Sequence, residues 1–306
     1  MIAPPPLRPG DTIAIVPTAR AISVEELEAG IALAKSWGLL VKLGQGVGCK
    51  HFQQAGTDME RLEDLQAAIN DPDVRAIWCA RGGYGTIRLL DRIDLRPLMR
   101  DPKWIVGFSD ITALHNTLHN FGLRSIHAQM PFNIQGKSPA TQETLRRALF
   151  GEPFSIEMSS MEIHGMDRQG QGEGFLIGGN LSILNALRGT PYDIDPTGKI
   201  LFLEDLDELL YHLDRMVQNL RLAGWFKALA GLIIGGMTEM RNKNENDPFG
   251  MSAEEIISDA IGEVAYPVCF GFPAGHIDDN RALILGGKAR LTVEKDRVEL
   301  LYLDPA

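Results

Sequence analysis

The first residue whose position suggests chemistry is a serine between an apolar run and a helix start. Trp104–Phe108 predicts a buried strand and Asp110–Phe121 a helix, so Ser109 lies at their junction. A serine there either caps the helix with its hydroxyl, which is the more common role, or is the nucleophile of a strand–turn–helix elbow. The segment Gly107-Phe108-Ser109-Asp110-Ile111 matches only the first three positions of the elbow motif GxSxG. Both interpretations stay open at this level.

A glycine-rich segment, Arg81-Gly82-Gly83-Tyr84-Gly85, follows the preceding predicted strand. Glycines permit a tight turn and close backbone approach, and their N–H groups could hold a phosphate or an oxyanion. The spacing is not GxGxxG, and no Gly-Lys-Ser/Thr follows, so neither a dinucleotide fingerprint nor a P-loop is predicted. A plain strand–helix turn remains the alternative.

A nucleophilic serine needs a base and an acid that orients the base. His276 suits the base because it lies in a loop beside glycine and acidic residues, although an exposed loop histidine is the alternative. Glu204 follows the apolar run Ile200–Leu203, where a carboxylate is costly unless it is paired. His115 and His119 lie four residues apart on the predicted helix, and we interpret them as surface or packing residues because no third metal ligand is evident.

The first half of the chain alternates strand and helix patterns, with capping boxes expected at Ser23 and Thr57. Strands separated by helices imply parallel pairing with right-handed crossovers, and short apolar strands are typical of a sheet covered on both faces. We therefore predict a doubly wound α/β domain over residues 1–150. Its strands are expected at Thr12–Val16, Leu39–Leu43, Val74–Cys79, Trp104–Phe108 and Ser125–Ala128.

The second half of the chain does not show the regular alternation of strands and helices. Residues 151–174 predict a linker, and the Gly-rich polar stretch 165–174 within it predicts a loop. Residues 175–306 predict a mixed α+β domain with more sheet than the first, ending in a hairpin over 289–303. Its other strands are expected at Phe175–Ile177, Ile200–Leu203, Leu232–Ile234, Val268–Phe272 and Leu283–Leu285.

The amino-acid composition makes some classes of function poor candidates. The 306 residues carry 30 Lys+Arg against 40 Asp+Glu, a formal net charge of −10. Such a chain is a poor candidate for binding nucleic acid or an anionic membrane surface. The N-terminal segment has no apolar stretch typical of a secretion signal. The three cysteines are odd in number and far apart, so we expect reduced thiols that are core residues, in a cytoplasmic protein.

Taken together, these segments resemble the LD-carboxypeptidase family, also called murein tetrapeptide carboxypeptidases. The resemblance spans nearly the whole chain, and the order of the motifs is more specific than any one of them. The matching segments are Pro9–Ala14, Arg81–Gly85, Gly107–Thr112, Gly178–Leu181, Leu203–Asp205, Asp214–Met216, and Gly275-His276 followed by Asn280.

The resemblance implies a function and a site. Ser109 would be the nucleophile, His276 the base and Glu204 the orienting acid, while backbone amides of Asp110 and Gly83 would form the oxyanion hole. It implies a flavodoxin-like first domain, a smaller barrel-like second domain, a homodimer, and hydrolysis without metal or cofactor. The substrate would be a murein tetrapeptide that loses its terminal D-alanine during cell-wall recycling. The family commonly has Tyr where Phe108 stands here.

Other points stay open. Arg81, Asn180 and Arg215 are candidates for binding the substrate carboxylates, but a buried ion pair, a loop cap and helix packing, respectively, explain them at least as well. The same family includes microcin self-immunity proteins, which cleave aminoacyl-nucleotide analogues. A third possibility is a non-catalytic module that binds flavin or a nucleotide, in which Ser109 would be a cap and His276 a surface residue.

Overall fold

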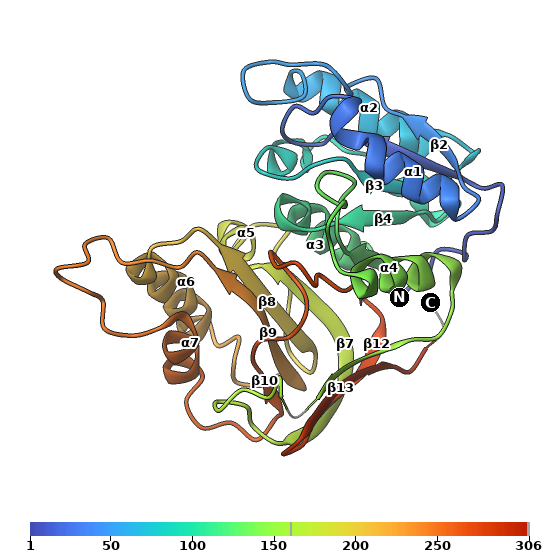
Figure 1. Cartoon of the computed structure of the whole chain (residues 1–306). Helices are drawn as coiled ribbons and strands as arrows, with labels where there is room; N and C mark the ends of the chain where they lie inside the picture. The colour runs from blue at the N-terminus through green and yellow to red at the C-terminus, as the bar shows by residue number, and fades with distance from the viewer. Residues whose placement is uncertain (160, 305–306) are drawn as a thin grey trace. The chain divides into compact units, whose positions relative to one another are not determined.

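The protein is described here by a computed structural model that covers residues 1–159 and 161–304. The chain forms two compact units (Figure 1). The first contains Met1–Phe154 together with Asp278–Gly287, and the second contains Ser155–Ile277 together with Lys288–Asp304. The chain therefore enters the second unit, returns to the first for one short segment, and enters the second again.

The first unit is built on a six-stranded sheet in the order β11-β5-β4-β3-β1-β2. The strands β2, β1, β3, β4 and β5 are parallel, in the order of flavodoxin-like doubly wound folds. β11 pairs antiparallel with β5 at the edge. The strand bounds are β1 Thr12–Val16, β2 Leu40–Leu43, β3 Val74–Cys79, β4 Trp104–Gly107, β5 Ser125–His127 and β11 Leu283–Leu285.

Helices connect these strands, and local sequence signals set where they begin. Thr57 and Glu60 form the predicted capping box at the start of α2. Ser23 and Glu26 exchange the same pair of hydrogen bonds ahead of α1, where a short 3-10 turn comes first. Each α-helix is short, and α2 packs on β1 and β3. The bounds are α1 Glu28–Ser36, α2 Asp58–Asn70, α3 Thr112–Asn120 and α4 Pro139–Phe150.

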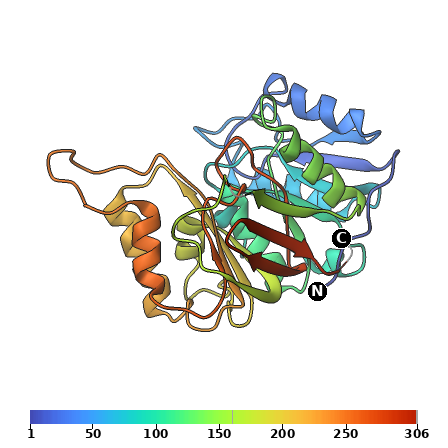
Figure 2. The same ribbon diagram turned by 60° about the horizontal axis from the view of Figure 1, so that its bottom comes forward.

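The second unit is built on a seven-stranded mixed sheet in the order β10-β9-β8-β7-β12-β13-β6. The long strand β7 joins its two parts, because its first half pairs antiparallel with β12 and its second half parallel with β8. β12 and β13 form the predicted C-terminal hairpin, drawn in dark red in Figure 2. The bounds are β6 Ser155–Ser159, β7 Gly170–Asn180, β8 Ile200–Leu206, β9 Gly231–Thr238, β10 Val268–Cys269, β12 Lys288–Val293 and β13 Arg297–Tyr302.

One face of this sheet carries helices α5, α6 and α7, and α6 and α7 lie side by side (Figure 1). Their apolar residues and those of β7, β8 and β9 form one buried cluster that includes Trp225, Phe226 and Phe270. The bounds are α5 Leu181–Ala186, α6 Leu210–Leu222 and α7 Ala253–Ile261.

Two expectations from the sequence are wrong in detail. The Gly-rich stretch 165–174 is not all loop, because β7 begins at Gly170. Glycine is needed in this strand because a Cβ on Gly174 would lie 2.7 Å from the carbonyl oxygen of Gly198, and backbones approach closely there. The strand Leu283–Leu285 exists, but it completes the sheet of the first unit rather than one in the second half.

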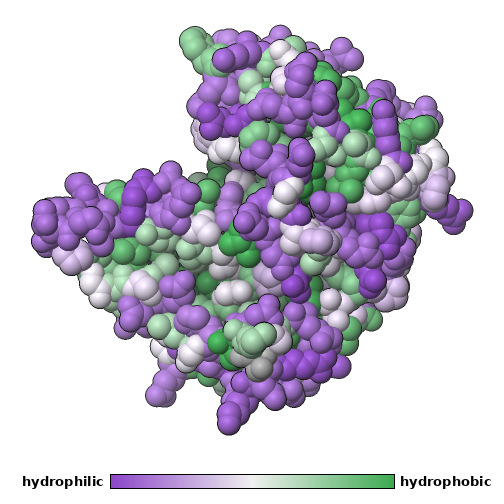
Figure 3. Space-filling model, in the orientation of Figure 1, coloured by the Kyte–Doolittle hydropathy of each residue, from purple (hydrophilic) through white to green (hydrophobic). Residues whose placement is uncertain are grey.

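The cysteines and the surface add two points. All three thiols are free, with Cys79 and Cys269 buried as expected, whereas Cys49 is exposed. Burial raises the pKa of the Cys79 thiol to about 12, so this thiol stays protonated. No helix in residues 1–159 and 161–304 is long and apolar enough to span a membrane. The exposed segment 241–250 is polar, and Figure 3 shows hydrophilic residues along the loop drawn in orange in Figure 1.

Candidate active site

Ser109 lies at a sharp turn between β4 and the helix that follows. Phe108 is extended, at φ −149° and ψ −172°, and Ser109 then takes φ +64°, in the left-handed region that favours glycine. Ser109 is not the N-cap of either following helix: Phe108 caps the 3-10 turn η4 (Ser109–Ile111) and Ile111 caps α3, and neither makes a side-chain cap hydrogen bond. The strained strand–turn–helix geometry is that of a nucleophile elbow.

The neighbours of Ser109 along the chain make this turn possible. A Cβ on Gly107 would lie 2.8 Å from Ile111 Cγ1 and 3.2 Å from Cys79 Cβ, so only glycine fits at the end of β4. Ile111 stands where GxSxG has its last glycine, and its side chain occupies the space over Gly107. The departure from the motif is therefore accommodated by packing within the same turn.

The glycine-rich segment lies against Ser109. A Cβ built on Gly82 would be 3.3 Å from Ser109 Cβ and 3.4 Å from its Oγ. Gly83 and Gly85 take φ +102° and +138°, which side chains rarely allow. The structure thus brings together Ser109, the first-turn amide of Asp110 and the segment that contains Gly83.

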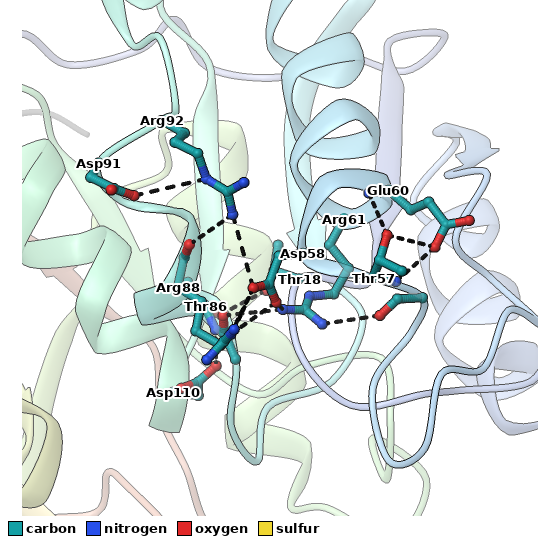
Figure 4. Close-up of polar contacts among 12 residues, drawn as sticks. Thr18, Thr57, Asp58, Glu60, Arg61, Thr86, Arg88, Asp91, Arg92 and Asp110 are labelled. Atoms are coloured by element: carbon teal, nitrogen blue, oxygen red, sulfur yellow. Dashed lines mark hydrogen bonds and ion pairs between the residues drawn. The ribbon is translucent and has the colours of Figure 1, made fainter.

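The carboxylate of Asp110 ties this segment to the elbow. Asp110 is buried, and its Oδ2 accepts a 2.9 Å hydrogen bond from the backbone N–H of Thr86. Burial raises the pKa of this carboxyl and outweighs the lowering effect of the hydrogen bonds with Thr86 and Gly85. The Thr86 hydroxyl lies 3.0 Å from that of Thr18, which follows β1 (Figure 4). Sequence reasoning considered only the amide of Asp110 and missed the role of its side chain.

A buried arginine holds the same segment from its other side. Arg61, on α2, is fully buried and donates to the carbonyls of Gly56, at 3.2 Å, and Gly85, at 3.5 Å. Asp58 compensates its charge at 2.7 Å and also pairs with Arg88, on η2 (Thr86–Leu89), as Figure 4 shows. A buried charge with several hydrogen bonds favours one backbone arrangement. The spacing Asp58–Arg61 in the first turn of a helix was the signal that sequence analysis could have used.

His115 fixes the end of β4. It is buried, with Nε2 2.9 Å from the carbonyl oxygen of Gly107 and Nδ1 2.8 Å from Ser125 Oγ. Since a carbonyl only accepts, Nε2 carries the hydrogen and Nδ1 accepts from the Ser125 hydroxyl. Burial lowers the pKa of this imidazole to about 4, so it is neutral near pH 7. His115 is a packing residue, as one of the two interpretations held.

In the second unit, the structure brings Glu204 and His276 together. Glu204 Oε2 lies 2.6 Å from His276 Nδ1 and also accepts from the His276 backbone N–H at 3.2 Å. The carboxylate of Glu204 is fully buried, and the side chain of His276 is 15% exposed. A carboxylate accepts, so the ring donates Nδ1–H and, when neutral, keeps Nε2 as a proton acceptor.

A glycine permits this pairing. Gly275 has φ +105°, and a Cβ on it would lie 2.7 Å from Glu204 Cβ and 2.8 Å from Glu204 Oε2. Thr238, at the end of β9, donates its hydroxyl to the carbonyl of His276 at 3.2 Å. The Gly-His sequence is thus needed because the loop that carries the imidazole passes directly over the carboxylate.

The neighbouring carboxylate has a different environment. Asp205 accepts from Asn180 Nδ2 and from the Ser182 N–H, both at 2.9 Å. Burial, and secondarily the charge of Glu204, raise the pKa of Asp205 to about 7. Asn180 caps α5 by accepting from the Ile183 N–H, which favours the structural explanation of this residue.

The other two predicted substrate-binding residues are arginines. Arg81 pairs with Glu26 at 3.5 Å, donates to the Ala21 carbonyl and lies over the ring of Phe132 at 4.1 Å. These contacts favour an ion pair over a free substrate contact, but the pair is partly exposed rather than buried. Arg215 is exposed on α6, with its guanidinium 5.5 Å from the ring centre of Tyr211.

Comparison with known proteins gives the class and then the family. The LD-carboxypeptidase N-terminal domain family matches residues 13–128, and the LD-carboxypeptidase C-terminal domain family matches residues 173–291. The protein is therefore a hydrolase, a serine-type carboxypeptidase. The chain belongs to the LD-carboxypeptidase family. The possibility of a non-catalytic flavin or nucleotide module is thereby wrong.

Two curated relatives are similar in sequence to this chain over nearly their full length. The chain is 35% identical to the Bacillus subtilis (strain 168) "Probable murein peptide carboxypeptidase", over 96% of this chain and 93% of the relative. It is 32% identical to the Pseudomonas aeruginosa "Murein tetrapeptide carboxypeptidase", over 91% and 92%.

Solved structures share the fold. The muramoyltetrapeptide carboxypeptidase of Oxalobacter formigenes superposes with a TM-score of 0.86 and 29% identity, over 96% of this chain and 100% of that one. The microcin C7 self immunity protein MccF in complex with aspartyl sulfamoyl adenosine gives a TM-score of 0.87 at 22% identity, over 100% of both chains. At that identity, the second likeness concerns the fold alone.

Proposed function

We propose that this carboxypeptidase hydrolyses the L,D-peptide bond before the terminal D-alanine of a murein tetrapeptide. The observation that carries the proposal is the strained turn at Ser109, with φ +64° at the carboxyl end of β4 and Gly82 against its hydroxyl. A non-glycine residue held in the left-handed region at the end of a buried strand is typical of an activated nucleophile. The names of the relatives from B. subtilis and P. aeruginosa support the murein substrate.

The proposed chemistry uses three side chains. His276 Nε2 takes the proton from Ser109 Oγ as Oγ attacks the carbonyl carbon before D-alanine. Protonated His276 then gives this proton to the leaving nitrogen, the C–N bond breaks, and D-alanine departs. Water, activated in the same way, hydrolyses the acyl ester and restores Ser109. Glu204 keeps the imidazole in the required tautomer and offsets its positive charge, as the 2.6 Å contact with Nδ1 supports.

The oxyanion would be held by backbone N–H groups of Gly83 and Asp110. The first N–H groups of a helix have no partner within it, and the amide of Asp110 is one of these. One such donor contributes about 3 kcal/mol to transition-state stabilisation in a well-studied hydrolase. The hydrogen bond from Thr86 to Asp110 and the contacts of Arg61 hold the segment that contains Gly83 in place.

The purified protein tests the proposal directly. Mass spectrometry of a murein tetrapeptide digest should show the loss of one D-alanine and no further cleavage. An aminoacyl-sulfamoyl adenosine, assayed side by side, should stay intact. Cleavage of the nucleotide analogue alone would contradict the murein substrate and favour an immunity-type hydrolase of the same family.

We propose further that the protein acts in the cytoplasm, in cell-wall recycling, and as a homodimer. The cysteine usage supports a reducing compartment, since all three thiols are free. Sedimentation velocity at micromolar concentration should give a single species of twice the 33.7 kDa chain mass, and a monomer would contradict the dimer.

A further inference from the structure

One arginine lies over the glycine segment beside the proposed nucleophile. Arg20 follows β1, and its backbone N–H donates to the Gly82 carbonyl at 3.4 Å. Its side chain crosses Gly83: a Cβ there would lie 2.7 Å from Arg20 Cγ and 3.6 Å from Nε, and would overlap Cδ. Gly83 is glycine for its φ of +102°, and the absence of a side chain leaves the space above it to Arg20.

The charge of Arg20 distinguishes it from the other arginines near this segment. Arg61 and Arg88 pair with Asp58, and Arg81 pairs with Glu26. Within residues 1–159 and 161–304, no carboxylate lies within ion-pair distance of Arg20, whose side chain is exposed. An exposed guanidinium without an acidic partner is available for an anionic ligand.

A carboxypeptidase needs a cation at this kind of position. In a terminal D-amino acid, three bonds separate the carboxylate carbon from the scissile carbonyl carbon. At standard bond lengths the two carbons are therefore about 4 Å apart. If the oxyanion lies at the Gly83 amide, the terminal carboxylate lies within reach of a side chain that crosses Gly83. The protein carries a net charge of −10, so a local cation is also needed to attract an anionic peptide.

We propose that Arg20 binds the terminal carboxylate of the substrate and so makes the enzyme an exopeptidase. A guanidinium forms two parallel hydrogen bonds with a carboxylate, whereas a C-terminal amide offers one acceptor and no charge. Arg20 therefore discriminates a free C-terminus from a blocked one. This inference rests on the proposed function, since it concerns the leaving D-alanine of the same reaction.

The experiment compares two substrates, the murein tetrapeptide and the same peptide with a C-terminal amide. The unaltered protein should strongly prefer the free acid. Arg20→Gln should lower kcat/KM for the acid about 10- to 100-fold, mainly through KM, and leave the amide nearly unchanged, because only the acid loses a charge-assisted pair. Arg20→Lys, which keeps the charge without the planar fork, should fall between the two.

Arg8→Gln is the matched control, because Arg8 is another exposed arginine and precedes β1, at the opposite end of this strand from Arg20. It should change neither substrate. Equal losses for acid and amide in Arg20→Gln would show that Arg20 only supports the loop and would overturn the inference, as would an unchanged preference for the acid. Absence of any tetrapeptide hydrolysis by the unaltered protein would overturn the proposed function, and this inference with it.

Discussion

The proposed catalytic groups come from two units that hold them by different means. In the first unit, the backbone positions them: Ser109 is placed by a left-handed turn, and the proposed oxyanion donors are peptide N–H groups. In the second unit, a side-chain pair positions them, since Glu204 Oε2 lies 2.6 Å from His276 Nδ1. In the first unit, mutations should therefore act mainly by changing the backbone conformation around Ser109. In the second unit, they should act mainly by changing the charge of the Glu204–His276 pair.

The largest expected effect is the loss of the nucleophile. Ser109→Ala should lower kcat on the order of 10⁵-fold or more, as in other serine hydrolases that lose this residue. The free energy of unfolding should stay unchanged, because alanine keeps the Cβ and the backbone of the turn. D-Alanine release followed by mass spectrometry measures the first, and urea unfolding the second. Substantial remaining hydrolysis would contradict the role of Ser109.

The corresponding change in the second unit removes only a charge. Glu204→Gln should lower kcat on the order of 10⁴-fold, because an amide can donate to Nδ1 and so favour the wrong tautomer of His276. The control is Glu208→Gln, which alters another Glu–His pair of the same unit, Glu208 and His212, also at 2.6 Å. We expect the control to keep full activity. Equal losses in both variants would mean that general electrostatics, rather than this pair, explains the effect.

One buried titratable group in each unit, His115 in the first and Asp205 in the second, gives stability an opposite pH dependence. The pKa of His115 falls from 6.5 to about 4, so its contribution to stability is complete above pH 6.5 and is lost as the pH falls through about 4. The pKa of Asp205 rises from 3.8 to about 7, so its contribution is complete below pH 3.8 and is lost as the pH rises through about 7. Each amounts to about 3–4 kcal/mol in all, at about 1.4 kcal/mol per pH unit.

Single substitutions can separate the pH dependence that His115 gives to the free energy of unfolding from the one that Asp205 gives. Between pH 4.5 and 6.5, the free energy of unfolding of His115→Gln should fall more steeply with pH than that of the unaltered protein, because the opposing His115 contribution is gone. That of Asp205→Asn should change in the other direction, because the Asp205 contribution is gone. Urea unfolding at several pH values measures both. Parallel curves for the two variants would contradict this assignment.

The smallest effect concerns the strain at the elbow. Ser109→Gly should raise the free energy of unfolding by about 1 kcal/mol, because glycine adopts φ +64° without cost. Ser109→Ala is the control, since it keeps the strained Cβ. A glycine variant no more stable than the alanine variant would mean that the turn stores no strain.

The sequence predicted those features that depend on neighbours along the chain. The Thr57–Glu60 box, the strand Val74–Cys79 and the C-terminal hairpin are confirmed. The proposed triad residues were predicted in the same way, because Ser109 and Glu204 each follow an apolar run and His276 follows a glycine.

Features that depend on contacts between distant parts of the chain could not be predicted from such local patterns. Nothing near Leu283 in the chain indicates that it pairs with His127. The spacing of Asp58 and Arg61 indicates an ion pair, but not that the arginine is buried against Gly85. Arg20 was overlooked for the same reason, because its position matters only through Gly83, which is 63 residues away in the chain. Long-range pairing and burial depend on the whole fold, which local patterns do not encode.

The short strand β11 has a consequence for how the protein can be divided. Because it returns from residues 278–287 to complete the edge of the first sheet, neither unit corresponds to one continuous stretch of the gene. A fragment that ends at residue 154 would leave the edge of β5 uncovered, which favours aggregation. Exchange of halves between relatives would therefore need two inserted segments rather than one crossover. The histidine at position 276 lies only two residues before the chain passes back to the first unit, so such an exchange would have a junction directly beside the proposed general base.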